Sequence, residues 1–188
     1  MSRIYMVRHG RAAAGWNVDP DPALDDLGKK QSLDVAAVLK HKGPLPVISS
    51  PLLRCQQTAF PLATAWGKDV TIEPAVGEIP SPEGYALEDR TEWLRAAMAT
   101  TWTQVTQVSG LKYEHYRNNI ARVVAALTTD TVVFSHFVAI NAVIGAATSD
   151  DRVMITSLDN CSVTIFETDG TGQLRLVEVG VEADTLIR

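Results

Sequence analysis

Two histidines and two arginines stand just after short hydrophobic runs of the chain. His9 follows Arg8 at the end of one run, His136 follows a second run, and Arg54 lies one helical turn beyond a third. A neutral imidazole can attack a phosphoryl group, and a guanidinium group offers paired donors to phosphate oxygens. If the fold gathers these four side chains, the pattern predicts phosphoryl transfer through a phosphohistidine, with His136 in its protonated form stabilising the transferred oxygens.

A reaction of this kind also needs a proton donor for the leaving oxygen. Residues 77–90 form a loop rich in proline and glycine, and long loops in compact domains are often functional. Glu78, at the start of this loop, is the carboxyl group we expect to act as donor. The neighbouring carboxylates remain alternatives: Glu73, Glu83, Glu88 and Asp89.

Strand and helix patterns alternate along the chain, which predicts an α/β fold: a three-layer α/β/α sandwich whose central sheet is mostly parallel and has an antiparallel edge strand. The expected strands are residues 4–7, 46–49, 69–72, 131–135, 162–167 and 174–179. The expected helices run from Asp25 or Asp26 to about residue 42, from Pro51 to 66, over 88–98, from 113 onward, and over 138–147.

Ligands of such sheets bind beyond the carboxyl ends of the strands. The two histidines and Arg54 stand at three of these ends, so we expect one site at one edge of the sheet. Ser50 followed by Pro51 predicts that a helix begins at Pro51 and directs its positive N-terminal end toward this site.

Length and charge limit the classes of protein to consider. The 188 residues predict a single domain, 1–188, with a substrate-covering segment at about 79–110. With 17 basic and 22 acidic residues the net charge is -5, which argues against nucleic acid or anionic lipid as partner and favours a small anionic ligand held by local positive charge.

No membrane span is expected, although residues 131–149 contain no Asp, Glu, Lys or Arg, because this run is better explained as a buried strand and helix. The hydrophobic run at residues 4–7 is too short for a signal-peptide core, so a cytoplasmic location is expected. Cys55 and Cys161 are then free thiols, and the Asn160 glycosylation triplet is not used.

Four segments resemble the histidine phosphatase superfamily, which includes cofactor-dependent phosphoglycerate mutase and many small phosphatases. Arg8-His9-Gly10 matches the signature tripeptide, and residues 24–31 resemble the Leu-Thr-x-x-Gly-x-x-Gln helix start. Residues 49–59 match the segment Ser-Ser-Pro-Leu-x-Arg-x-x-Gln-Thr-Ala nearly throughout, and Ser135-His136 completes the set. The resemblance extends from residue 4 to about 167 and implies a phosphoglycerate mutase-like fold.

The resemblance implies a role for each residue at the predicted site. His9 is the nucleophile that becomes phosphorylated, Arg8, Arg54 and His136 form the phosphate pocket, and Glu78 is the proton donor. No metal or other cofactor is implied.

Two further residues belong to this expectation. Asn17 corresponds to a polar pocket residue of many members, and Arg11 adds a positive charge that favours substrates with a second anionic group. Phe137 stands where a glycine normally follows the second histidine. Residues 79–82 lack the aromatic, glycine-rich pattern of the mutases, which favours a phosphatase.

The expected function is therefore hydrolysis of a phosphomonoester of a small metabolite. The alternatives are phosphoglycerate mutase-type transfer and a non-catalytic module that binds phosphate or a phosphoprotein. A metal hydrolase using His9 and His136 as ligands is a fourth possibility, but no His-Glu-x-x-His spacing supports it.

Overall fold

The computed structural model describes residues 1–183, and the last five residues of the predicted domain, 184–188, lie outside the described residues. A six-stranded sheet forms its centre, in the order β3-β2-β4-β1-β5-β6. The strands are β1 (Ser2–Arg8), β2 (Val47–Ser49), β3 (Val70–Ile72), β4 (Thr131–Ser135), β5 (Val163–Thr168) and β6 (Leu174–Glu178). The first four pair in parallel, and β5 and β6 are antiparallel, as the sequence predicts.

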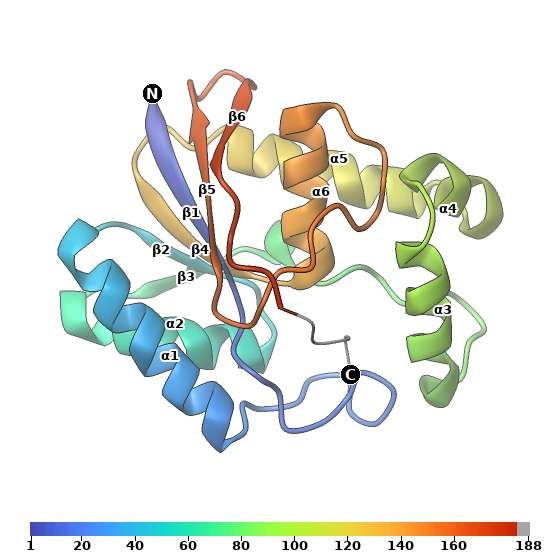
Figure 1. Ribbon diagram of the computed structural model, residues 1–188, viewed down its shortest axis with the longest axis horizontal. Coiled ribbons are helices and arrows are strands. Elements are labelled where there is room, and N and C mark those ends of the chain that lie inside the picture. The colour runs from blue at the N-terminus through green and yellow to red at the C-terminus, as the bar shows by residue number, and fades with distance from the viewer. Residues whose placement is uncertain (184–188) are drawn as a thin grey trace.

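Helices cover both faces of the sheet (Figure 1). They are α1 (Asp26–Leu39), α2 (Leu53–Trp66), α3 (Arg90–Met98), α4 (Trp102–Ser109), α5 (Lys112–Ala125) and α6 (Phe137–Thr148). The pair α1 and α2 lies on one face and α5 and α6 lie on the other, while α3 and α4 extend to one side beyond the sheet (Figure 1). The predicted three-layer architecture is confirmed.

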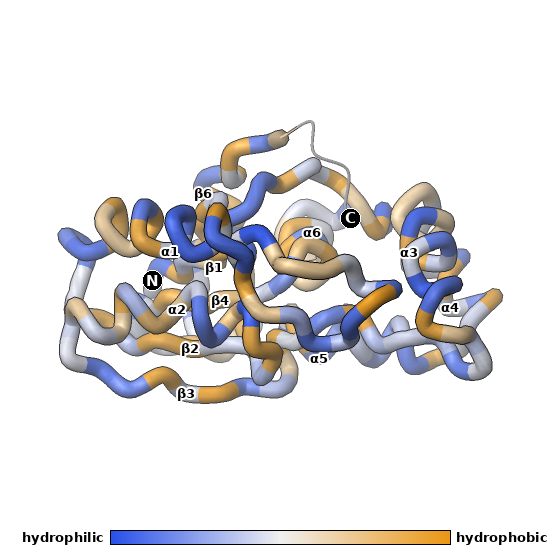
Figure 2. Tube along the Cα trace, turned by 90° about the horizontal axis from the view of Figure 1, so that it is seen from below, coloured by the Kyte–Doolittle hydropathy of each residue, from blue (hydrophilic) through white to orange (hydrophobic). Residues whose placement is uncertain are grey.

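Strand β1 shows why both faces need helices. Its side chains alternate, so that Ile4 and Met6 join the core under α5 and α6, whereas Tyr5 and Val7 join the core under α1 and α2. All four are buried, and each large apolar side chain removed from water contributes about 1.5–3 kcal/mol. Hydrophobic residues also run through α6, which lies against the sheet (Figure 2). The core thus fixes β1 from both sides up to Arg8.

The start of α1 agrees with the prediction, because Asp25 caps it by accepting the backbone N–H of Gly28 at 2.7 Å. The start of α2 differs. The helix begins at Leu53 and not at Pro51, because Leu52 has an extended backbone, with ψ at 139°. Its first amide donates to Asp21 Oδ1 at 2.7 Å, so this helix end is already occupied by a carboxylate.

The segment at 79–110 contains two helices, of which α4 was not predicted. Its signal is a capping box: Thr101 Oγ1 accepts the Gln104 N–H at 3.2 Å, and Gln104 Oε1 accepts the Thr101 N–H at 3.1 Å. Eight residues are too few to show a clear helical period, which is why the pattern was missed. Among the described residues, no helix is both long and apolar enough to cross a membrane.

Candidate active site

The two histidines meet because their strands are neighbours. Arg8 and Ser135 are partners in the parallel register of β1 and β4, so His9 and His136 leave the sheet at the same level. Their rings lie 5.3 Å apart between centroids. Arg54, in the first turn of α2, reaches both from the neighbouring strand end. The predicted convergence at one sheet edge is what the structure shows.

The hydrogen bonds of His9 define its tautomer. Its Nδ1 lies 2.8 Å from the carbonyl oxygen of Gly10, which can only accept, so Nδ1 carries the proton. Nε2 therefore holds the lone pair, and Arg54 Nε donates to it at 3.2 Å. Burial and the positive charges of Arg54 and Arg8 lower the pKa of His9 well below its usual value. His9 is thus a neutral imidazole with a defined nucleophilic nitrogen.

Gly10 has to be a glycine for a steric reason. A Cβ at this position would lie 2.6 Å from the carbonyl oxygen of Gly28, at the start of α1. The two glycines of the matched motifs thus allow the loop after β1 to pack directly on α1. This contact fixes the carbonyl that holds the ring of His9.

His136 is fully buried and is held on both ring nitrogens. Its Nε2 lies 2.8 Å from Ser50 Oγ, and its Nδ1 lies 3.2 Å from Arg54 Nη2 and 3.4 Å from Glu78 Oε2. Burial, Arg54 and His9 lower the pKa of His136 well below its usual value, so it is neutral in this structure. The two negative charges of a phosphoryl group beside it would raise this pKa, toward the protonated form expected from the sequence.

The carboxyl group of Glu78 lies beside Arg54 and His136, where a proton donor is expected. Its Oε2 is 3.5 Å from Arg54 Nη2, and its Oε1 accepts the backbone N–H of Ile79 at 3.0 Å. Burial raises the pKa of Glu78 above its ordinary value, although Arg54 acts in the opposite direction. A raised pKa is the direction that a general acid requires, because the carboxyl group must hold a proton before it donates one.

Both arginines of the pocket keep donors free. Arg8 Nη1 donates to the carbonyl oxygen of Leu158 at 2.5 Å, and its guanidinium lies over the ring of Phe137, 5.1 Å from the centroid. Arg8 Nε and Arg54 Nη1 are buried without a partner in the structure. Because both donors belong to guanidinium groups beside His9, they are available to bind the oxygens of an anion there.

The helix N-terminus at the site belongs to α6, and the prediction that α2 supplies it was wrong. His136 is the N-cap of α6, and Phe137 and Val138 in its first turn line the cavity in front of His9. The first amides of a helix have no acceptor within it and favour negative charge. At α2, by contrast, the carboxylate of Asp21 already accepts the first amide N–H of the helix, from Leu53.

A cavity of about 400 Å³ opens in front of His9. Arg8, Arg54 and Glu78 line it together with Arg11, whose Nε lies 2.5 Å from Asp25 Oδ2. The sequence did not indicate this ion pair. Asn17, whose loop diverges from the family pattern, is half-buried and is not among the residues that line the cavity.

Asn160 is a further residue of the site, which the sequence did not predict. Its Nδ2 donates to the carbonyl oxygen of His9 at 2.9 Å, and its side chain lines the cavity. The next residue, Cys161, has a positive φ of 57° and donates its N–H to the carbonyl oxygen of Arg8 at 3.0 Å. The only signal in the sequence was a polar residue just before a predicted strand, which was interpreted as part of an unused glycosylation triplet.

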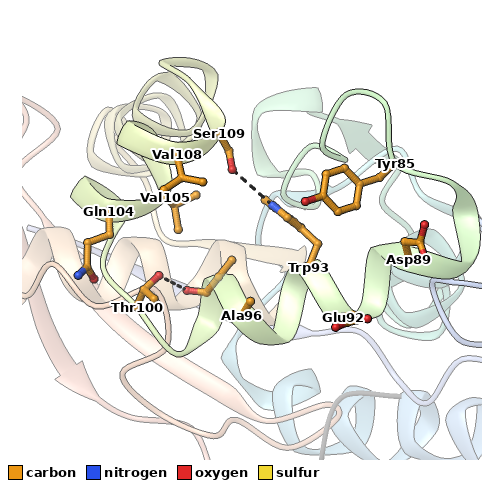
Figure 3. A pocket seen from close by; sticks show the side chains of 11 residues that line it. Tyr85, Asp89, Glu92, Trp93, Ala96, Thr100, Gln104, Val105, Val108 and Ser109 are labelled. Atoms are coloured by element: carbon orange, nitrogen blue, oxygen red, sulfur yellow. Dashed lines mark hydrogen bonds between the residues drawn. The ribbon is translucent and has the colours of Figure 1, made fainter.

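A second cavity, of about 530 Å³, lies between α3 and α4 (Figure 3). Trp93, Val105 and Val108 form much of its wall, and Trp93 Nε1 donates to Ser109 Oγ at 3.5 Å. Its lining, as far as the chain is described, contains no histidine, arginine or lysine. The groups capable of phosphoryl chemistry are therefore those around His9.

The site does not favour a metal ion, although His9, Glu78 and His136 have ligand atoms within 4.8 Å of one another. Arg54 lies among them, 3.2 Å from each histidine and 3.5 Å from the carboxylate. A divalent cation bound by all three groups would take the place of a buried guanidinium. The set fits phosphate binding by Arg54 better than metal ligation.

The comparison with protein families agrees with this chemistry. A model of the histidine phosphatase superfamily (branch 1) matches residues 4–181. The chain belongs to the histidine phosphatase superfamily. The resemblance found in the four sequence segments is thereby confirmed over nearly the whole chain.

Curated relatives of this chain share about a third of the aligned residues. The probable phosphoglycerate mutase GpmB of Cronobacter sakazakii is 34% identical over 85 residues, 42% of this chain and 39% of the relative. Glucosyl-3-phosphoglycerate phosphatase of Mycolicibacterium vanbaalenii is 35% identical over 80 residues, 40% of this chain and 36% of the relative. The chain thus spans about two fifths of the length of the relatives it matches.

Solved structures match nearly the whole of this chain at lower identity. A mycobacterial glucosyl-3-phosphoglycerate phosphatase has a TM-score of 0.73 at 21% identity, over 97% of this chain and 100% of that chain. Phosphoserine phosphatase from Entamoeba histolytica has 0.72 at 19%, over 98% of each chain. Phosphoglycerate mutase from Bacillus anthracis has 0.70 at 17%, over 95% and 92%. The expected phosphoglycerate mutase-like fold is confirmed.

Proposed function

We propose that this histidine phosphatase hydrolyses phosphate monoesters of small metabolites through a phosphohistidine at His9. The observation that carries the proposal is the state of His9. Its Nε2 carries an electron pair, because Nδ1 holds the proton and donates it to Gly10, and it lies at a cavity bordered by Arg8 and Arg54. A neutral nucleophile among guanidinium donors suits attack on a dianionic phosphoryl group, whose charge these donors bind.

Each step balances in bonds and protons. Nε2 of His9 forms a bond to phosphorus as the ester P–O bond breaks, and the leaving oxygen takes the proton of the Glu78 carboxyl group. Water then attacks the phosphohistidine, Glu78 takes up a proton from it, and phosphate leaves with His9 restored. Arg8, Arg54 and His136 bind the phosphoryl oxygens in both steps.

Two features support the expected substrate-covering segment and the expected cytoplasmic location. Leu94 of α3 lines the cavity, which supports the expectation that the segment at about 79–110 covers the substrate. Cys55 and Cys161 are free thiols, which fits the reducing cytoplasm. Names among the relatives support a small phosphorylated metabolite as substrate, and the name phosphoglycerate mutase supports the transfer reaction as the second candidate.

A panel of phosphorylated metabolites, assayed with the wild type and with His9→Ala, tests the proposal. We expect release of inorganic phosphate from at least one monoester by the wild type and none above background by the variant. Transfer of the phosphoryl group between positions of phosphoglycerate, with no phosphate released, would favour the mutase. Tight vanadate binding with no turnover of any ester would favour a non-catalytic module.

A further inference from the structure

The cavity in front of His9 is bordered by three cationic side chains among the residues that the structure describes. Arg8 and Arg54 lie beside the nucleophile, and each keeps a buried N–H without a partner. A phosphoryl group bound at His9 takes these donors, since guanidinium groups bind phosphate oxygens. Arg11 is then the described cation left for a second negative charge on the substrate.

Arg11 is already paired with a carboxylate. Its Nε lies 2.5 Å from Asp25 Oδ2, and Asp25 also lines the cavity. Asp25 is fixed in turn, because its Oδ1 accepts the Gly28 N–H at the start of α1. A substrate carboxylate brought to Arg11 would lie beside Asp25 and be repelled by it. This end of the cavity therefore offers no net positive charge.

Much of the remaining wall is hydrophobic. Trp16, Leu94, Phe137 and Val138 line the cavity from the loop after β1, from α3 and from the first turn of α6. The ring of Trp16 is supported by that of Trp93, 6.5 Å away between centroids. Surfaces of this kind favour uncharged apolar groups, which lose water-exposed area when they bind.

We propose that the substrate carries its negative charge on the phosphoryl group alone and presents an uncharged, hydrophobic or aromatic alcohol moiety to the cavity. This inference rests on the proposed phosphomonoesterase activity and narrows its substrate class. It reverses the expectation, made from the sequence, that Arg11 favours a substrate with a second anionic group. The expectation is reversed because the carboxylate of Asp25 neutralises the charge of Arg11.

The test compares kcat/KM for phenyl phosphate and 3-carboxyphenyl phosphate, two esters that differ by one carboxylate. Both are measured with the wild type, Asp25→Asn and Asp26→Asn. Asparagine at 25 keeps an oxygen to cap α1 but removes the charge that neutralises Arg11. Asp26 is the matched control, because it pairs with Lys29 at 3.1 Å and does not line the cavity.

We expect the wild type to prefer phenyl phosphate by about fivefold or more, because the carboxylate loses water beside the hydrophobic wall and gains no net attraction from the Arg11–Asp25 pair. Removal of one negative charge about 4 Å away should shift this ratio by about fivefold toward the carboxylated ester. Asp25→Asn should bring the kcat/KM values of the two esters to within about twofold of each other, and Asp26→Asn should keep their ratio at the wild-type value. Equal or better hydrolysis of the carboxylated ester by the wild type would overturn the inference, as would an unchanged ratio in Asp25→Asn.

These outcomes are separable from failure of the proposed function. If phenyl phosphate is hydrolysed without the expected preference, the phosphatase stands and the substrate class is wrong. If neither ester is hydrolysed and no phosphohistidine forms, the proposed function fails and the inference fails with it. Thermal melting curves of the three proteins show whether each variant is folded.

Discussion

Arg54 donates from its Nε to Nε2 of His9, the nitrogen that is free to attack, at 3.2 Å. The same guanidinium lies 3.2 Å from His136 Nδ1 and 3.5 Å from Glu78 Oε2. One side chain thus contacts the candidate nucleophile, the second histidine and the proton donor. Its positive charge keeps the nucleophile unprotonated, and its donors must turn toward the phosphoryl group when a substrate binds.

The pH dependence of the reaction should show this effect. Because burial, Arg54 and Arg8 lower the pKa of His9, kcat/KM should stay high as the pH falls past the usual histidine value and drop only below it. Arg54→Gln removes one positive charge, so the pKa of His9 should rise and the acid limb should move to higher pH. We also expect about a 10²- to 10³-fold lower rate from the lost phosphate donor.

The control is Arg3→Gln, at the opposite end of β1, where Arg3 pairs with Glu167. This variant should keep the wild-type pH profile. An acid limb that stays in place or moves to lower pH in Arg54→Gln would contradict the electrostatic role of Arg54.

Glu78→Gln should affect esters according to their leaving groups. An alkoxide needs a proton as it leaves, so hydrolysis of an alkyl phosphate should fall by about 10²- to 10⁴-fold. A nitrophenolate leaves without help, so kcat/KM for p-nitrophenyl phosphate, which reports formation of the phosphohistidine and not its hydrolysis, should fall far less than kcat/KM for the alkyl phosphate. The alkaline limb of the alkyl phosphate profile should also disappear, since the pKa of Glu78, raised by burial, sets it. An equal loss for both esters would show that Glu78 is not the proton donor.

Ser50 should be a positioning residue through its hydroxyl, which lies 2.8 Å from His136 Nε2. Ser50→Ala leaves that nitrogen with only the weak contact to Cys55 Sγ at 3.4 Å, and we expect about a tenfold lower kcat with KM little changed. Ser50→Thr restores the hydroxyl and should restore kcat. Ser49→Ala is the matched control, because its buried Oγ contacts the carbonyl oxygen of Ser50 and not the histidine. Loss of activity in the threonine variant as well would point to packing instead.

Asn141 should matter for stability. It is fully buried in α6, where its Nδ2 donates to the carbonyl oxygens of Phe137 and Thr156 and its Oδ1 accepts the N–H groups of Ile155 and Thr156. Asn141→Ala leaves several of these buried groups unpaired, at a cost of about 1–3 kcal/mol for each. We expect the free energy of unfolding in urea to fall by about 3 kcal/mol or more. The exposed Asn118→Ala should change it by less than about 0.5 kcal/mol.

The sequence predicted the fold well where local patterns and packing agree. The runs that became β1 and β4 are hydrophobic on both faces and can only be buried strands, and their parallel register brings His9 and His136 together. A short matched motif then predicted Arg54 at the same place, and the proline- and glycine-rich loop pointed to Glu78 there. Gly10 and Gly28 were part of those motifs, but their mutual contact becomes visible only in three dimensions.

Relationships between distant segments could not be predicted in this way. Asn160 contacts the backbone of His9 across 151 positions of sequence, and nothing local to Asn160 indicates this. The pair of Arg11 and Asp25 depends on how the loop after β1 folds back on α1. The start of α2 was misplaced because Ser-Pro is typical of a helix start, whereas here Asp21 from another loop takes the first free amide.

The most direct test of the account is to trap the phosphorylated enzyme. Wild type mixed with a hydrolysable monoester and quenched in alkali, where phosphohistidine survives, should carry one phosphoryl group, and mass spectrometry of its peptides should locate it on His9. Glu78→Gln given p-nitrophenyl phosphate should accumulate more of this species, because the base for the water step is lost. Turnover with no phosphoryl group on His9, or a phosphorylated residue elsewhere in an active His9→Ala variant, would contradict the account.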